Sequence, residues 1–156
     1  MADATNGIMA GERMQDLGAE RDRRSRETGL WHTLGYSLGD YGPGRAEVSW
    51  QATPEYGFDT ENGYVVQGGL VTALLDAAMG NACWTALDRN QVFLTADLRV
   101  EFLRPTRPGL LTAKATVVRR TRQIVFCSAE LFDDEGTLLA ASRCTQSVQP
   151  AGGATG

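Results

Sequence analysis

The feature that most constrains this chain is a long apolar segment, residues 68–87, with strand-like patterns on both sides of it. Its apolar residues point all round a helical axis, which predicts a helix buried on most sides. Ala73, Ala77 and Gly80 stand at i, i+4 and i+7, a stripe of small residues that would let the helix approach a sheet closely. Spanning a bilayer takes about 20 predominantly apolar residues. Asp76 and the Gly and Thr residues around it indicate a buried core helix instead.

The rest of the chain alternates with the period of a half-buried strand. A hairpin is predicted before the helix, around the turn Tyr41-Gly42-Pro43-Gly44, and a loop is expected over residues 53–63. The predicted strands cover residues 34–40, 45–51, 94–102, 111–117, 124–132 and 137–148. A single helix must be covered by a single sheet, so the chain is predicted to be an α+β protein.

The 156 residues suffice for one domain of ordinary size. Residues 1–28 carry dense charge of both signs and are interpreted as an N-terminal extension, either helical or disordered. Residues 29–149 form the predicted single domain, and residues 150–156 a flexible tail. The first residues lack a basic region followed by an apolar run, so no secretory signal is expected.

Composition excludes several classes of function. The net charge is −4, which argues against nucleic acid as a partner because a phosphate backbone selects basic surfaces. His32 is the single histidine. The three cysteines, Cys83, Cys127 and Cys144, form no CxxC pair. We therefore expect no metal site, no disulfide framework and a reducing, cytoplasmic location.

The candidate site lies on the apolar segment. Asp76 is its single formal charge. A buried carboxylate must be paired or must face a cavity, so Asp76 either meets a basic residue for structural reasons or serves a function. Thr72, one turn earlier, could bond it. Gly68 and Gly69 open the helix, where free N–H groups and the positive end of the dipole can hold a carbonyl oxygen that gains charge. The alternative is a tight junction between loop and helix.

Three runs of this sequence together resemble a known group of enzymes. They are Gln67–Gly80, the strand Thr95–Pro105 and the closing run Asp134–Thr145. The chain resembles the hotdog-fold acyl-CoA thioesterase superfamily over about residues 30–148, and within it the phenylacetic-acid-degradation thioesterases most closely. Helices of that group begin His-Gly-Gly, with a carboxylate nine positions after the histidine. Here Gln67 stands where the histidine would be, nine positions before Asp76.

The resemblance implies a hotdog fold, in which a curved antiparallel sheet of five to six strands wraps one long central helix. It implies a homodimer or homotetramer with sites between subunits, an acyl-CoA substrate, no cofactor and no membrane. Asp76 would be the general base or nucleophile, and the Gly68 N–H would donate to the thioester oxygen. Thr95 would help to hold water, while Gln67 would bond a carbonyl or hold the loop. The implied substrate contacts are Asn62, Gly69 and Thr72.

A basic stretch adds to this expectation. Between Phe102 and Ala129 there is no acidic residue, and the basic residues are Arg104, Arg107, Lys114, Arg119, Arg120 and Arg122. Arginine suits the phosphates of coenzyme A, so Arg104, Arg119, Arg120 and Arg122 are candidate ligands. The alternative is a solvated turn and strand face.

Two other functions stay open. A non-hydrolytic acyl-CoA-binding module would keep the fold and the basic stretch without turnover, and Gln67 favours it because glutamine does not change charge near neutral pH. A hotdog dehydratase or hydratase needs a histidine near the helix start, where this chain has Gln67. His32 lies upstream of the first hairpin.

Overall fold

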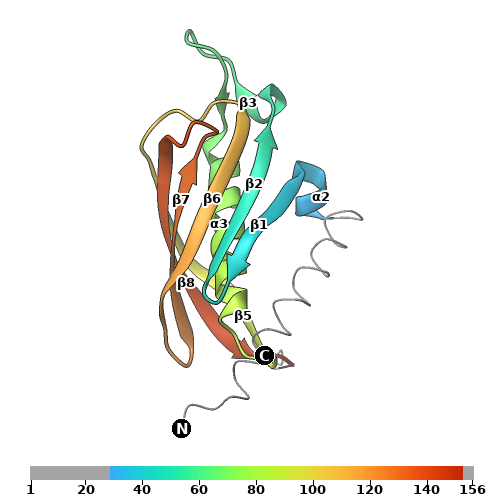
Figure 1. Cartoon of the computed structure of the whole chain (residues 1–156), viewed down its shortest axis with the longest axis vertical. Helices are drawn as coiled ribbons and strands as arrows, with labels where there is room; N and C mark the ends of the chain where they lie inside the picture. The colour runs from blue at the N-terminus through green and yellow to red at the C-terminus, as the bar shows by residue number, and fades with distance from the viewer. Residues whose placement is uncertain (1–28, 153–156) are drawn as a thin grey trace.

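The computed structural model describes residues 29–152, which form one helix-and-sheet unit (Figure 1). The elements before the long helix are α2 Leu30–Leu34, β1 Tyr36–Gly42, β2 Arg45–Ala52, the 3₁₀ turn η1 Pro54–Tyr56, β3 Gly57–Phe58 and β4 Val65–Val66. The long helix and the strands after it are α3 Gly68–Thr85, β5 Gln91–Phe102, β6 Gly109–Arg120, β7 Ile124–Phe132 and β8 Leu138–Pro150. The α+β prediction is confirmed, with the helix starting where the sequence predicted.

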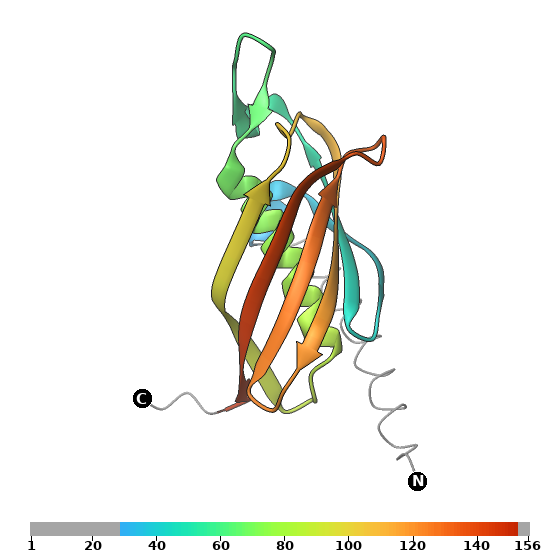
Figure 2. The same ribbon diagram turned by 90° about the vertical axis from the view of Figure 1, so that its left-hand side faces the viewer.

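Six antiparallel strands form one curved sheet in the order β1-β2-β6-β7-β8-β5. Figure 2 shows α3 lying along the concave side of this sheet, with β5 at one margin. Within residues 29–152, no further strand pairs with the outer edge of β5 or of β1. The long helix wrapped by a curved sheet is the hotdog layout that the resemblance implied.

Alternation along the strands supplies the core. Leu111, Ala113 and Ala115 of β6 are buried, whereas their neighbours on the strand are half-buried or exposed. The apolar residues of α3 that are buried are Val71, Leu74, Leu75, Ala78, Met79, Ala82 and Cys83. Large apolar side chains therefore hold the helix against the sheet, and burying one leucine contributes about 1.5–3 kcal/mol.

One side of α3 departs from the expectation of burial on most sides. Its exposed or half-buried stripe consists of Gly69, Thr72, Ala73, Asp76, Ala77, Gly80 and Trp84. The small residues thus follow the less covered side of the helix instead of facing the middle of the sheet. Gly80 does approach the sheet closely, since an added Cβ would stand 3.3 Å from the Phe93 ring of β5. The sheet is too narrow to cover this stripe.

Two short elements replace parts of the expected loop. η1 and the β3–β4 pair lie within residues 54–66, and these two-residue strands are too short to show a period in sequence. At the other end of the sheet β8 extends as far as Pro150, which pairs with Gln91. Residues 1–28, the predicted extension, lie outside the described residues. Among residues 29–152, no helix has the length and apolarity needed to cross a bilayer.

Candidate active site

Gln67 shapes the start of α3. Its Oε1 accepts from the Leu70 N–H at 3.2 Å, so the side chain caps the helix. Its own N–H donates to the Tyr56 carbonyl at 2.9 Å and ties the helix start to η1. A Cβ at position 69 would stand 2.7 Å from Gln67 Oε1, so a larger residue there would displace the capping side chain. Gln67 therefore holds the loop, one of its two expected roles.

The first two backbone N–H groups of α3 are free. Within residues 29–152, neither the Gly68 nor the Gly69 N–H has a hydrogen-bond partner. Gly68 also lines a groove of about 390 Å³ beside the helix start. Unpaired first-turn N–H groups and the positive end of the helix dipole favour an oxygen that carries negative charge.

The groove is mainly apolar. Its apolar side chains come from Phe58, Val65, Val66, Val71, Phe102 and Leu103. Arg104 also lines it, and its Nη1 donates to the Leu138 carbonyl at 2.6 Å. A Cβ at Gly68 would stand 3.2 Å from Phe102 Cζ, so glycine keeps this end of the groove open. The groove offers an apolar ligand one charged contact.

Asp76 and Thr95, to which the resemblance gives separate catalytic roles, lie within hydrogen-bond distance of each other. Thr95 Oγ1 donates to Asp76 Oδ1 at 3.0 Å. The register of β5 against β8 shifts between Thr95 and Asp97, a bulge that sets the direction in which Thr95 points. Asp76 is half-buried on the less covered stripe of α3. The carboxylate is thus held by one hydroxyl while remaining open on the side away from the sheet.

Thr72 does not bond Asp76, so that expectation was wrong. Its hydroxyl donates to the Gly68 carbonyl at 2.8 Å. A threonine inside a helix commonly bonds back to the carbonyl four residues earlier, which competes with any partner one turn onward.

Asn62 lies away from Asp76 in this chain. It is exposed at the tip of the hairpin between β3 and β4, where its N–H donates to Thr60 Oγ1 at 3.2 Å. Figure 2 shows this hairpin projecting beyond the body of the sheet. Its role as a substrate contact stays a prediction.

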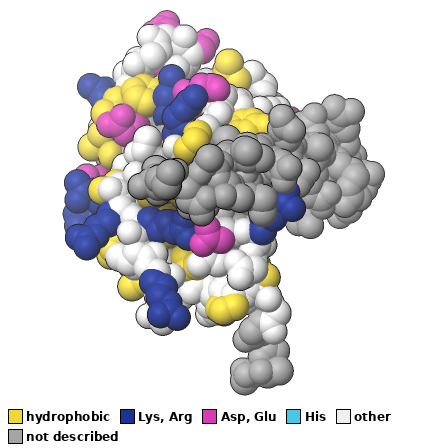
Figure 3. Space-filling model, turned by 60° about the horizontal axis from the view of Figure 1, so that its bottom comes forward, with side chains coloured by type: hydrophobic (Ala, Val, Ile, Leu, Met, Phe, Trp, Pro, Cys, Tyr) yellow, Lys and Arg dark blue, Asp and Glu magenta, His cyan; other side chains and the backbone are white. Residues whose placement is uncertain are grey.

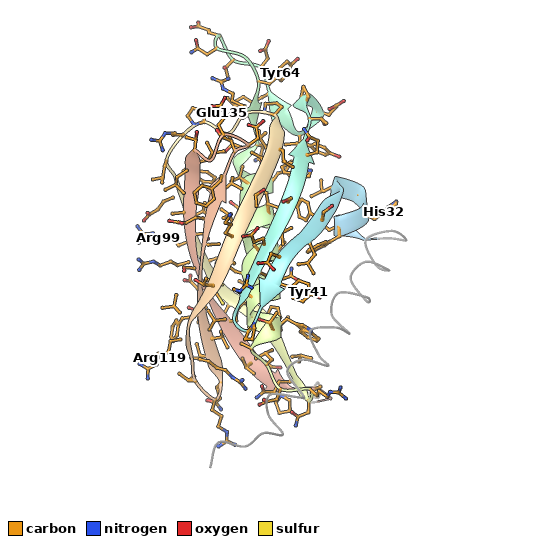
Figure 4. The ribbon with its side chains drawn as sticks, in the orientation of Figure 1. His32, Tyr41, Tyr64, Arg99, Arg119 and Glu135 are labelled. Atoms are coloured by element: carbon orange, nitrogen blue, oxygen red, sulfur yellow. The ribbon has the colours of Figure 1, made fainter. Side chains whose placement is uncertain are left out.

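The predicted phosphate ligands are divided between the two ends of the molecule. Arg104 lines the groove, whereas Arg120 donates to the Ala86 carbonyl just after α3 and pairs with Asp88 Oδ2 at 2.8 Å. Figure 4 shows Arg119 near the end of the sheet opposite Tyr64, which belongs to the hairpin before α3. Figure 3 shows Lys and Arg side chains spread in several groups over the visible face. One chain does not gather Arg119, Arg120 and Arg122 at the groove.

Sequence reasoning missed Gln146. This residue of β8 is fully buried, and its Oε1 lies 3.0 Å from Thr95 Oγ1. Its Nε2 lies 3.1 Å from Cys144 Sγ. The signal that could have found it is the pairing of Thr95 with Gln146 across β5 and β8, which becomes visible only once the strand register is known.

Residues 63–140, half of the chain, match the thioesterase superfamily. The chain belongs to the thioesterase superfamily. The match covers the helix that carries Gly68 and Asp76 and the strand that carries Thr95.

Individual relatives agree with this membership. The medium/long-chain acyl-CoA thioesterase YigI of Escherichia coli K12 is 28% identical over 97 residues, which cover 54% of this chain and 63% of YigI. The match thus spans less than two thirds of that relative's length. The PaaI protein from the phenylacetic acid degradation operon of E. coli superposes with a TM-score of 0.76 at 20% identity, covering 92% of this chain and 97% of PaaI. A thioesterase of Haemophilus influenzae gives 0.73 at 24% identity, covering 81% of this chain and 86% of that one. These structures share the fold.

Proposed function

We propose that this protein is an acyl-CoA thioesterase, which hydrolyses a thioester to a free acid and coenzyme A. The observation that carries the proposal is the Thr95–Asp76 hydrogen bond of 3.0 Å on the open side of α3. The same helix begins with the unpaired N–H groups of Gly68 and Gly69 beside an apolar groove. A carboxylate, a hydroxyl and free N–H donors are the groups that thioester hydrolysis needs.

The proposed site is shared between two subunits. Asp76 follows Gly68 by eight positions, which is about 12 Å along a helix axis, too far for both to act on one carbonyl. A second copy would bring its own helix start to this carboxylate. The outer edge of β5 supports such a partner, because Leu94 is 66% exposed and Phe102 is 55% exposed beside it. Unpaired edges of this length favour association. We therefore propose a homodimer, alone or within a homotetramer.

Asp76 acts in one of two ways in this proposal. As a general base it takes a proton from water while the water oxygen attacks the carbonyl carbon. As a nucleophile it forms an anhydride that water then hydrolyses. In either route the carbonyl oxygen gains negative charge, which the Gly68 N–H of the other subunit stabilises. The C–S bond then breaks, and the coenzyme A thiolate leaves and takes up a proton.

The substrate side of the proposal rests on the groove. Its apolar lining fits an acyl chain or the pantetheine arm, and Arg104 at its margin fits a phosphate. YigI, by its name, acts on medium- and long-chain acyl-CoA, which supports an acyl-CoA substrate here.

A second candidate is a non-hydrolytic acyl-CoA-binding module. The observation that favours it is the Gln67 cap, since Gln67 Oε1 accepts from the Leu70 N–H at the position where the resemblance implies a histidine. Such a module would use the groove and the free N–H groups without turnover.

A panel of acyl-CoAs with detection of the released thiol distinguishes the two candidates. The thioesterase proposal predicts turnover that Asp76→Asn lowers by about 10²–10⁴-fold, the contribution of general-base assistance. The variant should keep its melting temperature and its affinity for acyl-CoA, because the amide preserves the shape of the carboxylate. A folded, ligand-binding variant with wild-type kcat would contradict the role of Asp76. Binding without turnover by the wild type would favour the binding module.

A further inference from the structure

A line of polar groups runs from the buried side of β8 to Asp76. Gln146 lies between Cys144 and Thr95, with Nε2 3.1 Å from Cys144 Sγ and Oε1 3.0 Å from Thr95 Oγ1. Thr95 Oγ1 in turn lies 3.0 Å from Asp76 Oδ1. Gln146 and Cys144 are 0% and 3% exposed, so no bulk water competes for their hydrogen bonds. A buried amide of this kind is costly unless its partners are arranged to satisfy it.

Counting hydrogens shows what the amide does. Thr95 has one hydroxyl hydrogen and stands at hydrogen-bond distance from two oxygens, Asp76 Oδ1 and Gln146 Oε1. An ionised carboxylate and an amide oxygen both only accept, so the hydroxyl can serve one of them at a time. Turning the Gln146 amide about its last side-chain bond places Nε2 against Thr95 Oγ1. The amide then donates, and the Thr95 hydrogen goes to Asp76.

The thiol of Cys144 can follow this turn. With the amide turned, Oε1 faces Cys144 Sγ and accepts its S–H. The hydrogen bond with Cys127 and burial hold the pKa of the Cys144 thiol well above its usual range. The thiol therefore keeps its hydrogen and can either donate to Oε1 or accept from Nε2.

We propose that Gln146 is a positioning residue, which aims the Thr95 hydroxyl at Asp76 while that carboxylate is ionised. When Asp76 has taken a proton from water, its O–H donates to Thr95, and Thr95 donates to Gln146 Oε1. That second arrangement has the Oε1-to-Thr95 contact seen in the structure. The four residues thus keep a continuous line of hydrogen bonds whether Asp76 is ionised or protonated. The proton that Asp76 takes from water is the only one that passes from one molecule to another. The inference rests on the proposed thioesterase function.

The first test needs no turnover. The infrared S–H stretch of the purified protein at neutral pH contains a band that Cys144→Ala identifies by its loss. In Gln146→Met, which conserves volume, this band should move to higher frequency, because the thiol loses the amide oxygen as acceptor and keeps the weaker sulfur acceptor of Cys127. An unmoved band would overturn the proposed donation from Cys144 to Gln146, and with it the proposed orientation of the amide.

The second test is a double-mutant cycle on acyl-CoA hydrolysis. Gln146→Met should lower kcat about 10-fold, the loss expected for one hydrogen bond to a charged group, with KM unchanged. In a Thr95→Val background the same substitution should lower kcat no further, because Gln146 acts through Thr95. Gln149→Met, on an exposed position of the same strand, is the control and should match the wild type. Additive losses or a raised KM would contradict the positioning role. A wild type without turnover would contradict the proposed function instead, and the infrared band would still decide the hydrogen-bond chain.

Discussion

The two ends of α3 differ in how their backbone groups are satisfied. At the C-terminal end, Arg120 donates to the Ala86 carbonyl. The Thr85 hydroxyl donates to the Ala82 carbonyl at 2.7 Å and accepts from the Gly44 N–H at 2.9 Å. At the N-terminal end, within the described part of the chain, the Gly68 and Gly69 N–H groups have no partner.

This difference separates structure from function on a single helix. Every helix leaves orphan groups at both ends, and a protein that needs stability alone satisfies them. Here the C-terminal end, the closed end, uses Arg120 and Thr85 for that purpose. The N-terminal end, the open end, leaves the Gly68 and Gly69 N–H groups as donors beside an apolar groove. The helix dipole favours an anionic oxygen there. We therefore propose that the N-terminal end of α3 is the end that binds the ligand.

Among the changes that compare the two ends of α3, the largest expected effect comes from removing an N–H at the N-terminal end. Gly68→Pro deletes that donor at the first helical position, where proline is tolerated, and Gln67 before it is already extended at ψ 130. Loss of one oxyanion donor should lower kcat about 10²–10³-fold. Mixing this variant with Asp76→Asn should restore up to about a quarter of wild-type activity, because half of the dimers would combine one intact helix start with one intact carboxylate. The measurement is thiol release after the subunits have been unfolded and refolded together.

The control is Gly68→Ala, which keeps the N–H and adds the Cβ that would stand 3.2 Å from Phe102 Cζ. It should keep most of the activity, since Phe102 is exposed and its ring can shift. No recovery in the mixture, with both variants folded and dimeric, would contradict the shared site.

A smaller effect is expected from the arginine at the groove. Arg104→Ala should raise KM for acyl-CoA about 10-fold and leave kcat unchanged, because a phosphate contact binds substrate and transition state alike. The effect should shrink at high salt. Arg122→Ala, at an exposed residue of the β6–β7 turn, is the matched control. Equal KM values for the two variants would place the phosphates elsewhere.

At the closed end the expected effect is on stability. Arg120→Ala leaves the Ala86 carbonyl and Asp88 without their guanidinium, which should cost about 1 kcal/mol and lower Tm by a few degrees. KM for acyl-CoA should stay at the wild-type value. Thermal melts and kinetics on the same preparation make the comparison. A raised KM with an unchanged Tm would return Arg120 to the set of phosphate ligands.

The fold was largely readable from the sequence because its signals are local. Period-two alternation marks the strands, and the apolar run opened by Gly68 and Gly69 marks α3. The uncovered stripe of α3 was not readable, since it depends on how far a six-stranded sheet reaches around the helix. The β3–β4 pair was missed because two-residue strands have no period.

The site was readable in part. The spacing of Gln67, Gly68 and Asp76, together with the family resemblance, pointed to the helix start and the carboxylate, and Thr95 was found on the next strand. Gln146 was missed because its role depends on strand register and on a bulge. Arg120 is an example of the opposite error, since basic residues close in sequence need not face the same way. Whether such a residue contacts a ligand or the protein itself depends on which carbonyl groups lie next to it in the fold.

An aromatic cluster is connected to the N-terminal, open end of α3. Trp31, Tyr36, Trp50 and Tyr56 follow one another with ring centroids 5.8, 5.8 and 5.2 Å apart. The Tyr56 carbonyl accepts the Gln67 N–H, so the cluster holds the residue that caps α3. Within residues 29–152 the Tyr36 hydroxyl is buried without a hydrogen-bond partner. Burial raises the pKa of Tyr36 from its ordinary value of 10.0 to about 12.

Tyr36→Phe should therefore have the smallest effect at neutral pH, because it removes a hydroxyl that has no partner, and such a change is close to neutral. The two proteins should separate at alkaline pH. Tyrosine ionises in the unfolded chain from about pH 10 but resists in the folded protein up to about pH 12, so its contribution to stability is present below pH 10 and is lost as pH rises toward 12. Wild-type stability should fall more steeply than that of Tyr36→Phe over this window, while the cysteines titrate equally in both. Urea midpoints measured at several pH values give the two curves. Parallel curves would mean that Tyr36 does not resist ionisation in the folded protein and that the cluster beneath the open end of α3 is not closed to water.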